Sequence, residues 1–234
     1  MSFQAADRSI VSQTSPAIER AFLRATFAWM FIGVGLTAGI AVWFSNNDAL
    51  MEKVRTQPGW LIGAMVGQLA VVFGLAFMIN RISAGLATFL FVLYAALTGA
   101  TFSIILGYYS TSSIAMAFAG ATGVFGGMAL WGFATKRDLS GLAPILFGAL
   151  IGFFVASIVY AFTRGSTFNL ILGFGGVLLF AGLTAYDVQK IKAYSATAMD
   201  DESARKMAIF GALQLYLDFV NIFLSLLRIF GSNR

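Results

Sequence analysis

Long apolar stretches alternate with short polar segments along most of the chain. Seven of these stretches reach the roughly 20 residues that a helix needs to cross the ~30 Å hydrocarbon core of a bilayer. They are predicted at residues 22–44, 59–79, 86–107, 114–134, 142–163, 168–189 and 207–230. The pattern therefore predicts an all-α integral membrane protein with a seven-transmembrane helix bundle.

The segments between the spans are short and polar. Residues 1–20 contain no apolar core of a secretory signal and are interpreted as a polar N-terminal tail. Residues 21–234 are interpreted as one membrane domain, in which the longest connection is expected at about residues 190–206. Glycine pairs four residues apart predict close contacts between helices. These pairs are Gly35/Gly39, Gly63/Gly67, Gly123/Gly127 and Gly148/Gly152.

The last predicted span, residues 207–230, is apolar but carries a polar stripe. Gln214, Asp218, Asn221, Ser225 and Arg228 follow each other at intervals of four, three, four and three residues, which places them on one helix face. A charge at mid-membrane costs from about 3 kcal/mol to about 10 kcal/mol or more, depending on the reference state. This face is therefore expected to turn towards other helices, water or ions.

Composition narrows the chemistry. Hydrophobic residues make up 59% of the chain and charged residues 11%, against roughly 25% charged in a soluble domain. The chain has no cysteine and no histidine, which excludes disulfides, thiolate chemistry and histidine as a base or metal ligand. Carboxyl groups are left as the side chains that can titrate near neutral pH when their environment shifts them.

The distribution of positive charge predicts an orientation. Ten of the 15 Lys and Arg residues fall in segments on the N-terminal side of the membrane, four fall on the other side, and Arg228 lies within the last span. The positive-inside rule therefore places the N-terminus in the cytoplasm and, after seven crossings, the C-terminus outside. A re-entrant last element would return the C-terminus to the inside. Topology explains the net charge of +5 without a nucleic-acid partner.

Two acidic residues, Asp187 and Asp218, lie within predicted spans, and an intramembrane carboxyl group indicates function by default. Thr184 lies one turn before Asp187, and Lys190, three residues after it, offers a purely local ion pair as the alternative. Asp218 has no basic residue within four positions, so its structural alternative is a hydrogen bond between helices.

The two aspartates would share a proton if they approached, because like charges repel and burial disfavours both charged forms. With the oxygens of Thr184, Gln214 and Asn221 they resemble part of a site for a hard cation such as calcium. Such a site needs water to complete its ligands, which favours passage over storage. Spacing alone does not bring the carboxyl groups together, because Asp218 lies ~16 Å along its helix while Asp187 lies near the inner boundary.

Three stretches resemble the Bax inhibitor-1 family, and the first resembles its bacterial branch. They are DRSIVSQTSPAIERAFLRATFAWM (7–30), FAGLTAYDVQKIK (180–192) and LQLYLDFVNIFLSLLRIFG (213–231). The resemblance implies a seven-helix fold with the last helix central and a pH-sensitive calcium leak. It also implies that Asp187 and Asp218 form a hydrogen-bonded pair.

The resemblance further implies a gate. An arginine at the inner end of span two would pair with Asp187 and close the path. Arg81 is the candidate for this arginine, although Asn80 could take the aligned position. Some members place a glutamate in span two opposite the arginine matching Arg228, whereas here Gln68 is the nearest polar residue. Bacterial relatives are linked to modulation of the membrane protease FtsH.

The expected partners are therefore calcium, protons and the bilayer of the bacterial inner membrane, with no resident cofactor. Regulation of another membrane protein, such as a membrane protease, is the alternative function. An intramembrane aspartyl protease fits less well. Tyr186-Asp187 matches the first half of a presenilin-like motif, but Leu215-Tyr216-Leu217 precedes Asp218 where Gly-x-Gly is required. No enzymatic activity is predicted.

Overall fold

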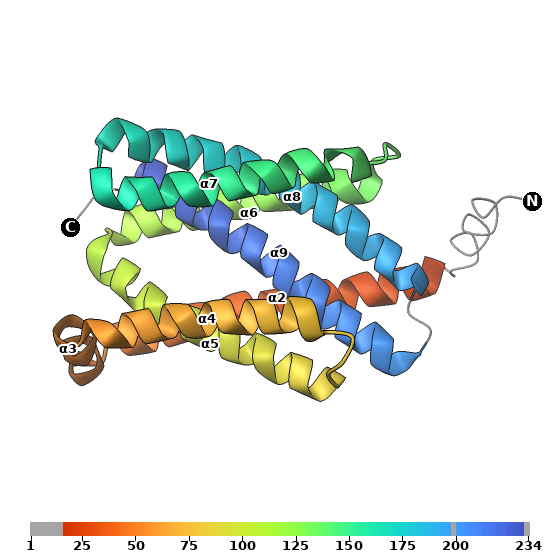
Figure 1. The fold of residues 1–234 in the computed structure, drawn as a ribbon, viewed down its shortest axis with the longest axis horizontal. Coiled ribbons are helices and arrows are strands. Elements are labelled where there is room, and N and C mark those ends of the chain that lie inside the picture. Colours follow the sequence, from red (N-terminus) through yellow and green to blue (C-terminus); the bar gives the residue numbers. More distant parts are fainter. Residues whose placement is uncertain (1–15, 198–199, 232–234) are drawn as a thin grey trace, which may run out of the picture. The chain divides into compact units, whose positions relative to one another are not determined.

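The computed structural model describes residues 16–197 and 200–231, and almost all of this range is helical (Figure 1). The helices are α2 (Pro16–Ser45), α3 (Asp48–Thr56), α4 (Pro58–Met78), α5 (Ala84–Tyr108), α6 (Thr111–Ala134), the 3-10 helix η1 (Ser140–Leu142), α7 (Ala143–Thr163), α8 (Ser166–Thr197) and α9 (Asp201–Phe230). Seven of the described helices are long and apolar enough to cross a membrane. The all-α fold and the seven predicted spans are confirmed. Residues 1–15 of the predicted tail, with Arg8, and Arg234 lie outside the described residues.

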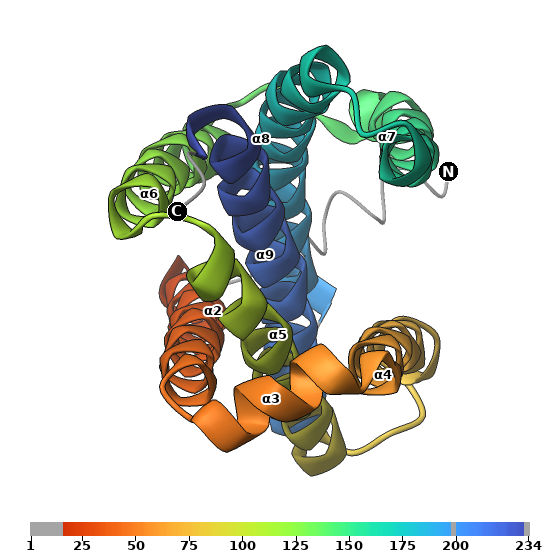
Figure 2. The ribbon, with the colours of Figure 1, turned by 90° about the vertical axis from the view of Figure 1, so that its left-hand side faces the viewer.

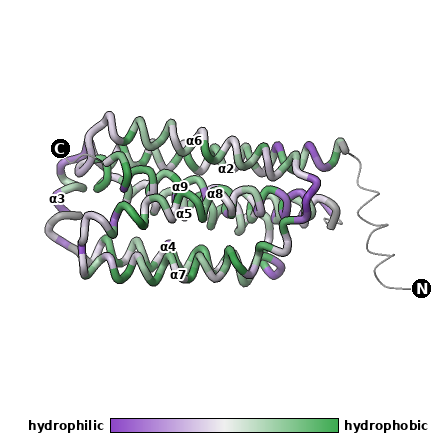
Figure 3. The backbone as a smooth tube through the Cα atoms, turned by 90° about the horizontal axis from the view of Figure 1, so that it is seen from above, coloured by the Kyte–Doolittle hydropathy of each residue, from purple (hydrophilic) through white to green (hydrophobic). Residues whose placement is uncertain are grey.

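Polar residues begin and end the spans (Figure 3). The side chains of Asn47 and Ser110 accept hydrogen bonds from the backbone N–H groups of Leu50 and Ser113, which caps α3 and α6. Pro58 opens α4, at a position where its missing N–H has no helical partner anyway. The helix α3 lies in a predicted connection and is too short and polar to have been predicted as a span.

The prediction of a long connection at about residues 190–206 is wrong. The helix α8 continues to Thr197, and α9 begins at Asp201. The length of an apolar stretch shows only the part of a helix that lies inside the bilayer. The polar residues that follow Gln189 contain no proline or glycine to end the helix, so it continues beyond the apolar stretch. Asp201 and Glu202 lie in the first turn of α9, where negative charge is favourable.

The chain forms two compact units, and α8 and α9 contribute to both. The first unit is Met1–Tyr108 with Ile191–Tyr216. In it α5 lies between α2 and α4, and α3 joins those two helices (Figure 2). Gly99 of α5 allows this packing, because a Cβ atom there would lie 2.7 Å from the carbonyl oxygen of Thr37 in α2. Phe91 and Leu75 are fully buried.

The second unit is Tyr109–Lys190 with Leu217–Arg234. It contains α6, η1, α7, most of α8 and the last part of α9. Phe125 of α6 packs edge-on against Phe219 of α9 with 5.7 Å between ring centroids, and Phe153 of α7 packs against Phe180 of α8 at 5.4 Å. Aromatic contacts therefore join α6 to α9 and α7 to α8 in this unit. One membrane domain over residues 21–234 stays a prediction.

The glycines that allow close helix contacts are not those in the predicted pairs. A Cβ atom at any member of Gly35/Gly39, Gly123/Gly127 or Gly148/Gly152 would meet nothing within 4 Å, and in Gly63/Gly67 only Gly67 has a neighbour, Leu97 at 3.4 Å. The tight approaches occur at single glycines, among them Gly99, Gly132 and Gly173. Four-residue spacing is common in membrane helices and does not select the packed face.

Candidate ion and proton site

The antiparallel packing of α8 and α9 positions the candidate site in the second unit. A Cβ atom at Gly173 of α8 would lie 2.8 Å from Cγ1 of Ile229 and 3.1 Å from the carbonyl oxygen of Ser225. A Cβ atom at Gly176 would clash with the Ser225 hydroxyl. The two helix backbones therefore approach closely, and Thr184, two turns further along α8, reaches the level of Asp218.

Asp187, Asp218 and Thr184 are buried, with 8%, 4% and 0% of their surface exposed. The Thr184 hydroxyl donates to the carbonyl oxygen of Phe180 at 2.7 Å and lies within hydrogen-bonding reach of the Asp218 carboxyl group. Asp187 is near enough to act electrostatically on Asp218. The hydrogen bond between the two aspartates that the family resemblance implies stays a prediction.

The extra turns of α8 and α9 explain how the two carboxyl groups come within electrostatic range. Asp187 lies about 15 Å before the end of α8, and Asp218 about 25 Å after the start of α9, at 1.5 Å per residue. Both aspartates are therefore well inside their helices. With the shorter spans predicted from hydropathy, Asp187 would have lain near the boundary of the membrane.

One oxygen of Asp218, Oδ2, is buried without a hydrogen-bond partner in the described part of the chain. Most buried polar atoms in proteins have a partner, so such an atom needs an explanation. Asp187 has a charged neighbour, since Lys190 acts on it electrostatically and lies 5.7 Å from the Tyr186 ring centroid. The local alternative for Asp187 therefore stays open.

The other stripe residues have different surroundings. Gln214, in the first unit, has a buried Oε1 without a partner among the described residues. Asn221 donates from Nδ2 to the carbonyl oxygen of Leu217 at 2.8 Å, within its own helix. Ser225 is buried at the contact with Gly176. Arg228 lies over two aromatic rings of α7.

Arg81 and Asp187, the two residues of the predicted gate, belong to different units. Arg81 of the first unit is exposed in the turn between α4 and α5, and its pairing with Asp187 stays a prediction. The side chain of Gln68 in α4 forms hydrogen bonds with α5. The Gln68 Oε1 accepts from the Thr98 hydroxyl at 3.4 Å, and the Gln68 Nε2 donates to the carbonyl oxygen of Leu97 at 3.4 Å. It therefore joins two helices of its own unit.

Sequence reasoning did not single out Gln189, which follows Asp187 by two residues. The Gln189 side chain forms hydrogen bonds with the connection between α6 and η1. Sequence reasoning also missed Ser157, whose buried hydroxyl has no partner among the described residues. Neither stands out in the sequence, because one is a polar residue at the end of a span and the other a serine in an apolar span. Among the residues that the structure describes, no three His, Cys, Asp or Glu side chains gather to hold a metal ion.

Comparison with known proteins identifies the relatives of the chain. A family model described as inhibitor of apoptosis-promoting Bax1 matches residues 19–234. The chain belongs to the Bax inhibitor-1 family. This confirms the resemblance carried by the Asp187 and Asp218 motifs, and with seven apolar helices it makes the chain a multi-pass membrane protein.

Relatives in this family match almost the full length. The inner membrane protein YbhL of Escherichia coli strain K12 is 46% identical over 215 residues, which cover 91% of this chain and 92% of YbhL. A Deinococcus radiodurans protein is 43% identical over 215 residues, with 92% and 91% covered. A membrane protein of Streptococcus pyogenes serotype M3 is 36% identical over 230 residues, with 97% and 99% covered. None of these descriptions names an enzymatic activity.

Proposed function

We propose that this Bax inhibitor-1 family protein is a pH-sensitive calcium leak channel of the bacterial inner membrane, with its N-terminus in the cytoplasm. Asp187 and Asp218 sense protons and line the ion path. The observation that carries the proposal is the pair of buried carboxyl groups within electrostatic range of each other, one of them with an oxygen that has no partner among the described residues. Groups of this kind inside a membrane protein are expensive and mark ion or proton paths.

The chemistry of the site suits passage rather than storage. Two carboxyl groups and the Thr184 hydroxyl supply fewer oxygens than the six to eight that calcium prefers, so water completes the shell and the ion leaves easily. Because like charges repel, the two aspartates bind one proton between them more readily than isolated carboxyl groups do. Proton binding changes both the charge of the path and the strength of any pairing with Arg81.

The sign of the pH effect follows from the gate. If Arg81 closes the path by pairing with ionised Asp187, protonation of the aspartate releases the arginine. Calcium flux is then expected to rise as the pH falls from 8 towards 6. The full chain, reconstituted in liposomes that contain a calcium-sensitive dye, tests this directly.

The decisive comparison is between the wild type and Asp187→Asn/Asp218→Asn. The amides keep the shape of the carboxyl groups but hold no charge, so the flux of the double variant is expected to lose its pH dependence. Asp138→Asn, in an exposed connection, removes an acid outside the site and serves as the control. Equal, equally pH-dependent flux from the wild type and the double variant overturns the proposal.

Regulation of another membrane protein, such as the FtsH protease, is the second candidate. The observation that favours it is the exposure of α7, whose span has no buried residue and whose Gly148 and Gly152 meet nothing within 4 Å. Small residues on a free helix face allow another helix to approach. Co-purification of a protease that is lost in Gly148→Leu/Gly152→Leu, yet kept in the double aspartate variant, supports this function over the channel.

A further inference from the structure

Arg228, near the end of α9, lies in an aromatic cage on α7. Its guanidinium carbon lies 5.7 Å from the ring centroid of Tyr160 and 6.0 Å from that of Phe153. Ser157 lies between these two residues on the same face of α7, since 153, 157 and 160 follow the helical repeat. The Ser157 hydroxyl and Nη1 of Arg228 are both buried, and neither has a hydrogen-bond partner in the described part of the chain.

The positive charge of Arg228 has no acidic partner in the part of the chain that the structure describes. Within residues 16–197 and 200–231, its side chain makes no hydrogen bond and no ion pair. Asp218 lies ten residues earlier on the same helix, about 15 Å away along the axis. Asp138 precedes α7, at the end opposite to Tyr160. Asp187 lies 14 residues beyond Gly173, the α8 residue where an added Cβ atom would lie 3.4 Å from Cβ of Arg228.

The guanidinium also lies some way from the end of the helix, with Nη1 buried. Contact with both rings places it level with Ser157, six residues or about 9 Å before the end of α7. The Arg228 side chain is expected to point back along α9 in this way, because helical side chains tilt towards the N-terminus of their helix. The two rings offset part of the cost through cation–π contacts. An anion bound to the guanidinium would offset the rest.

We propose that Arg228 and Ser157 form a binding site for a phosphate group between α7, α8 and α9. The planar guanidinium binds phosphate oxygens through two parallel N–H groups, and the serine hydroxyl adds a third donor. Arg228 is only partly buried as a residue, so part of its side chain can be reached from the surface. A lipid headgroup can reach this depth, because bilayers thin locally around arginine. Inorganic phosphate is the other source of the same chemistry.

The experiment uses the full chain in detergent with four probes: dioleoylphosphatidylglycerol, dioleoylglycerol with the same acyl chains but no phosphate, sodium phosphate and sodium chloride. Native mass spectrometry measures lipid binding, and thermal unfolding measures the effect of each probe. We expect phosphatidylglycerol to bind and to raise the unfolding temperature, and dioleoylglycerol to do neither. Stabilisation by sodium phosphate but not by sodium chloride assigns the site to the free anion, and stabilisation by the lipid alone assigns it to a headgroup.

Three variants decide the residues. Arg228→Gln is expected to weaken phosphate binding at least about tenfold, since it removes a charged hydrogen bond. Ser157→Ala is expected to weaken it about threefold, and it remains a test if the arginine variant does not fold. Arg164→Gln removes one exposed positive charge at the same end of α7 and should change nothing. Unchanged binding in Arg228→Gln or, where that variant does not fold, in Ser157→Ala, or equal binding of dioleoylglycerol, overturns the proposal.

Discussion

The side-chain amide of Gln189 donates from Nε2 to the carbonyl oxygen of Arg137, with a nitrogen–oxygen distance of 2.8 Å. Its Oε1 accepts from the N–H of Leu139, also at 2.8 Å. One side chain thus bonds to the connection between α6 and η1 on both sides of Asp138. Because Gln189 follows Asp187 by two residues, it fixes this connection to α8 at the same level along the helix as the candidate site, on a different face.

Replacing Gln189 with glutamate should loosen this connection. Glu keeps the size of Gln but has no N–H to donate to Arg137, and its second oxygen would face the carbonyl oxygen. We expect the free energy of unfolding to fall by about 1–2 kcal/mol, measured by thermal unfolding in detergent. Gln57→Glu is the matched control, because the Gln57 side chain makes no capping bond at α4. A loss as large in the control would show that added charge, not the lost bond, is responsible.

The same connection should not contribute to pH sensing. Hydrogen bonds from the backbone and side chain of Ser140 lower the pKa of Asp138 below its usual value. A carboxyl group with a lowered pKa contributes stability above its unfolded-state pKa and loses it only as the pH falls through the lowered value, which lies below the pH range of the flux experiment. Asp138→Asn should therefore leave calcium flux between pH 6 and 8 unchanged. A flattened pH profile in this variant would contradict the assignment.

Gly132 of α6 should tolerate no side chain. A Cβ atom there would clash with the carbonyl oxygen of Ala185 in α8 and lie 2.8 Å from its Cα, and backbone atoms cannot move aside. We expect Gly132→Ala to lower the free energy of unfolding by about 1–3 kcal/mol, as overpacking usually does. Gly127→Ala on the same helix meets nothing within 4 Å and is the control. Equal thermal stability of both variants would argue against the close α6–α8 contact.

The sequence predicts what depends on local pattern. Apolar length placed all seven spans, and the stripe from Gln214 to Arg228 indicated that α9 is shielded from lipid. In the apolar 18-residue stretch of α9, 67% of the residues are buried, against 39% or less in the other spans. Contacts between helices were not predictable, because they depend on which face turns inwards. That is why Gly132 was overlooked in favour of the Gly148/Gly152 pair, and why Ser157 was not connected with Arg228.

Tyr216 and Thr37 should be energetically coupled. Thr37 donates its one hydroxyl hydrogen to the carbonyl oxygen of Ala95 at 3.0 Å, so Tyr216, at 2.7 Å, is the donor in their shared bond. Both side chains are buried in the first unit. We expect a double-mutant cycle with Tyr216→Phe and Thr37→Val to give a coupling of about 0.6–1.7 kcal/mol in unfolding experiments. Thr37→Ser keeps the hydroxyl that accepts the bond, so a cycle with Thr37→Ser in place of Thr37→Val should show little coupling. Additive losses in the Thr37→Val cycle would show that the bond contributes nothing.

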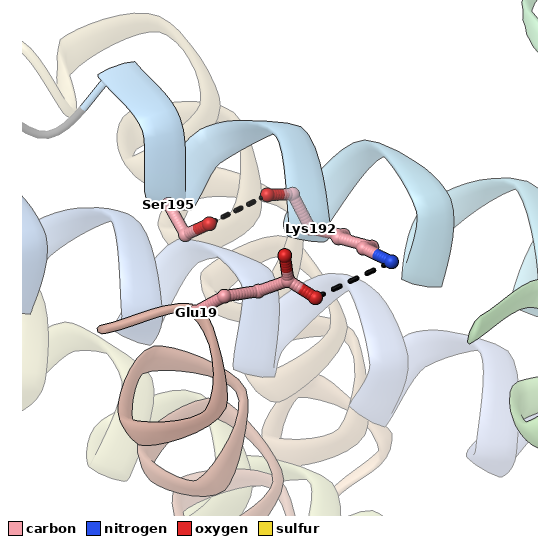
Figure 4. Close-up of polar contacts among 3 residues, drawn as sticks. All are labelled: Glu19, Lys192 and Ser195. Atoms are coloured by element: carbon pink, nitrogen blue, oxygen red, sulfur yellow. Dashed lines mark hydrogen bonds and ion pairs between the residues drawn. The ribbon is translucent and has the colours of Figure 1, made fainter. Parts of the chain in front are cut away.

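The ion pair of Glu19 and Lys192 should contribute little, and only at low salt. Lys192 Nζ lies 3.3 Å from Oε1 of Glu19, and the Lys192 carbonyl oxygen accepts from the Ser195 hydroxyl at 2.7 Å (Figure 4). The pair joins the first turn of α2 to the last turns of α8, but its side chains are 39% and 25% exposed. Solvent therefore screens it, and Glu19→Gln is expected to lower the free energy of unfolding by less than about 1 kcal/mol.

Salt separates this weak pair from a structural one. At 1 M salt the screening length falls to about 3 Å, so the difference between wild type and Glu19→Gln should disappear in thermal unfolding experiments. Glu52→Gln, on the exposed surface of α3, is the control for removing one negative charge. A loss that persists at 1 M salt would mean that Glu19 stabilises α2 through uncharged contacts of its side chain rather than through its charge and Lys192.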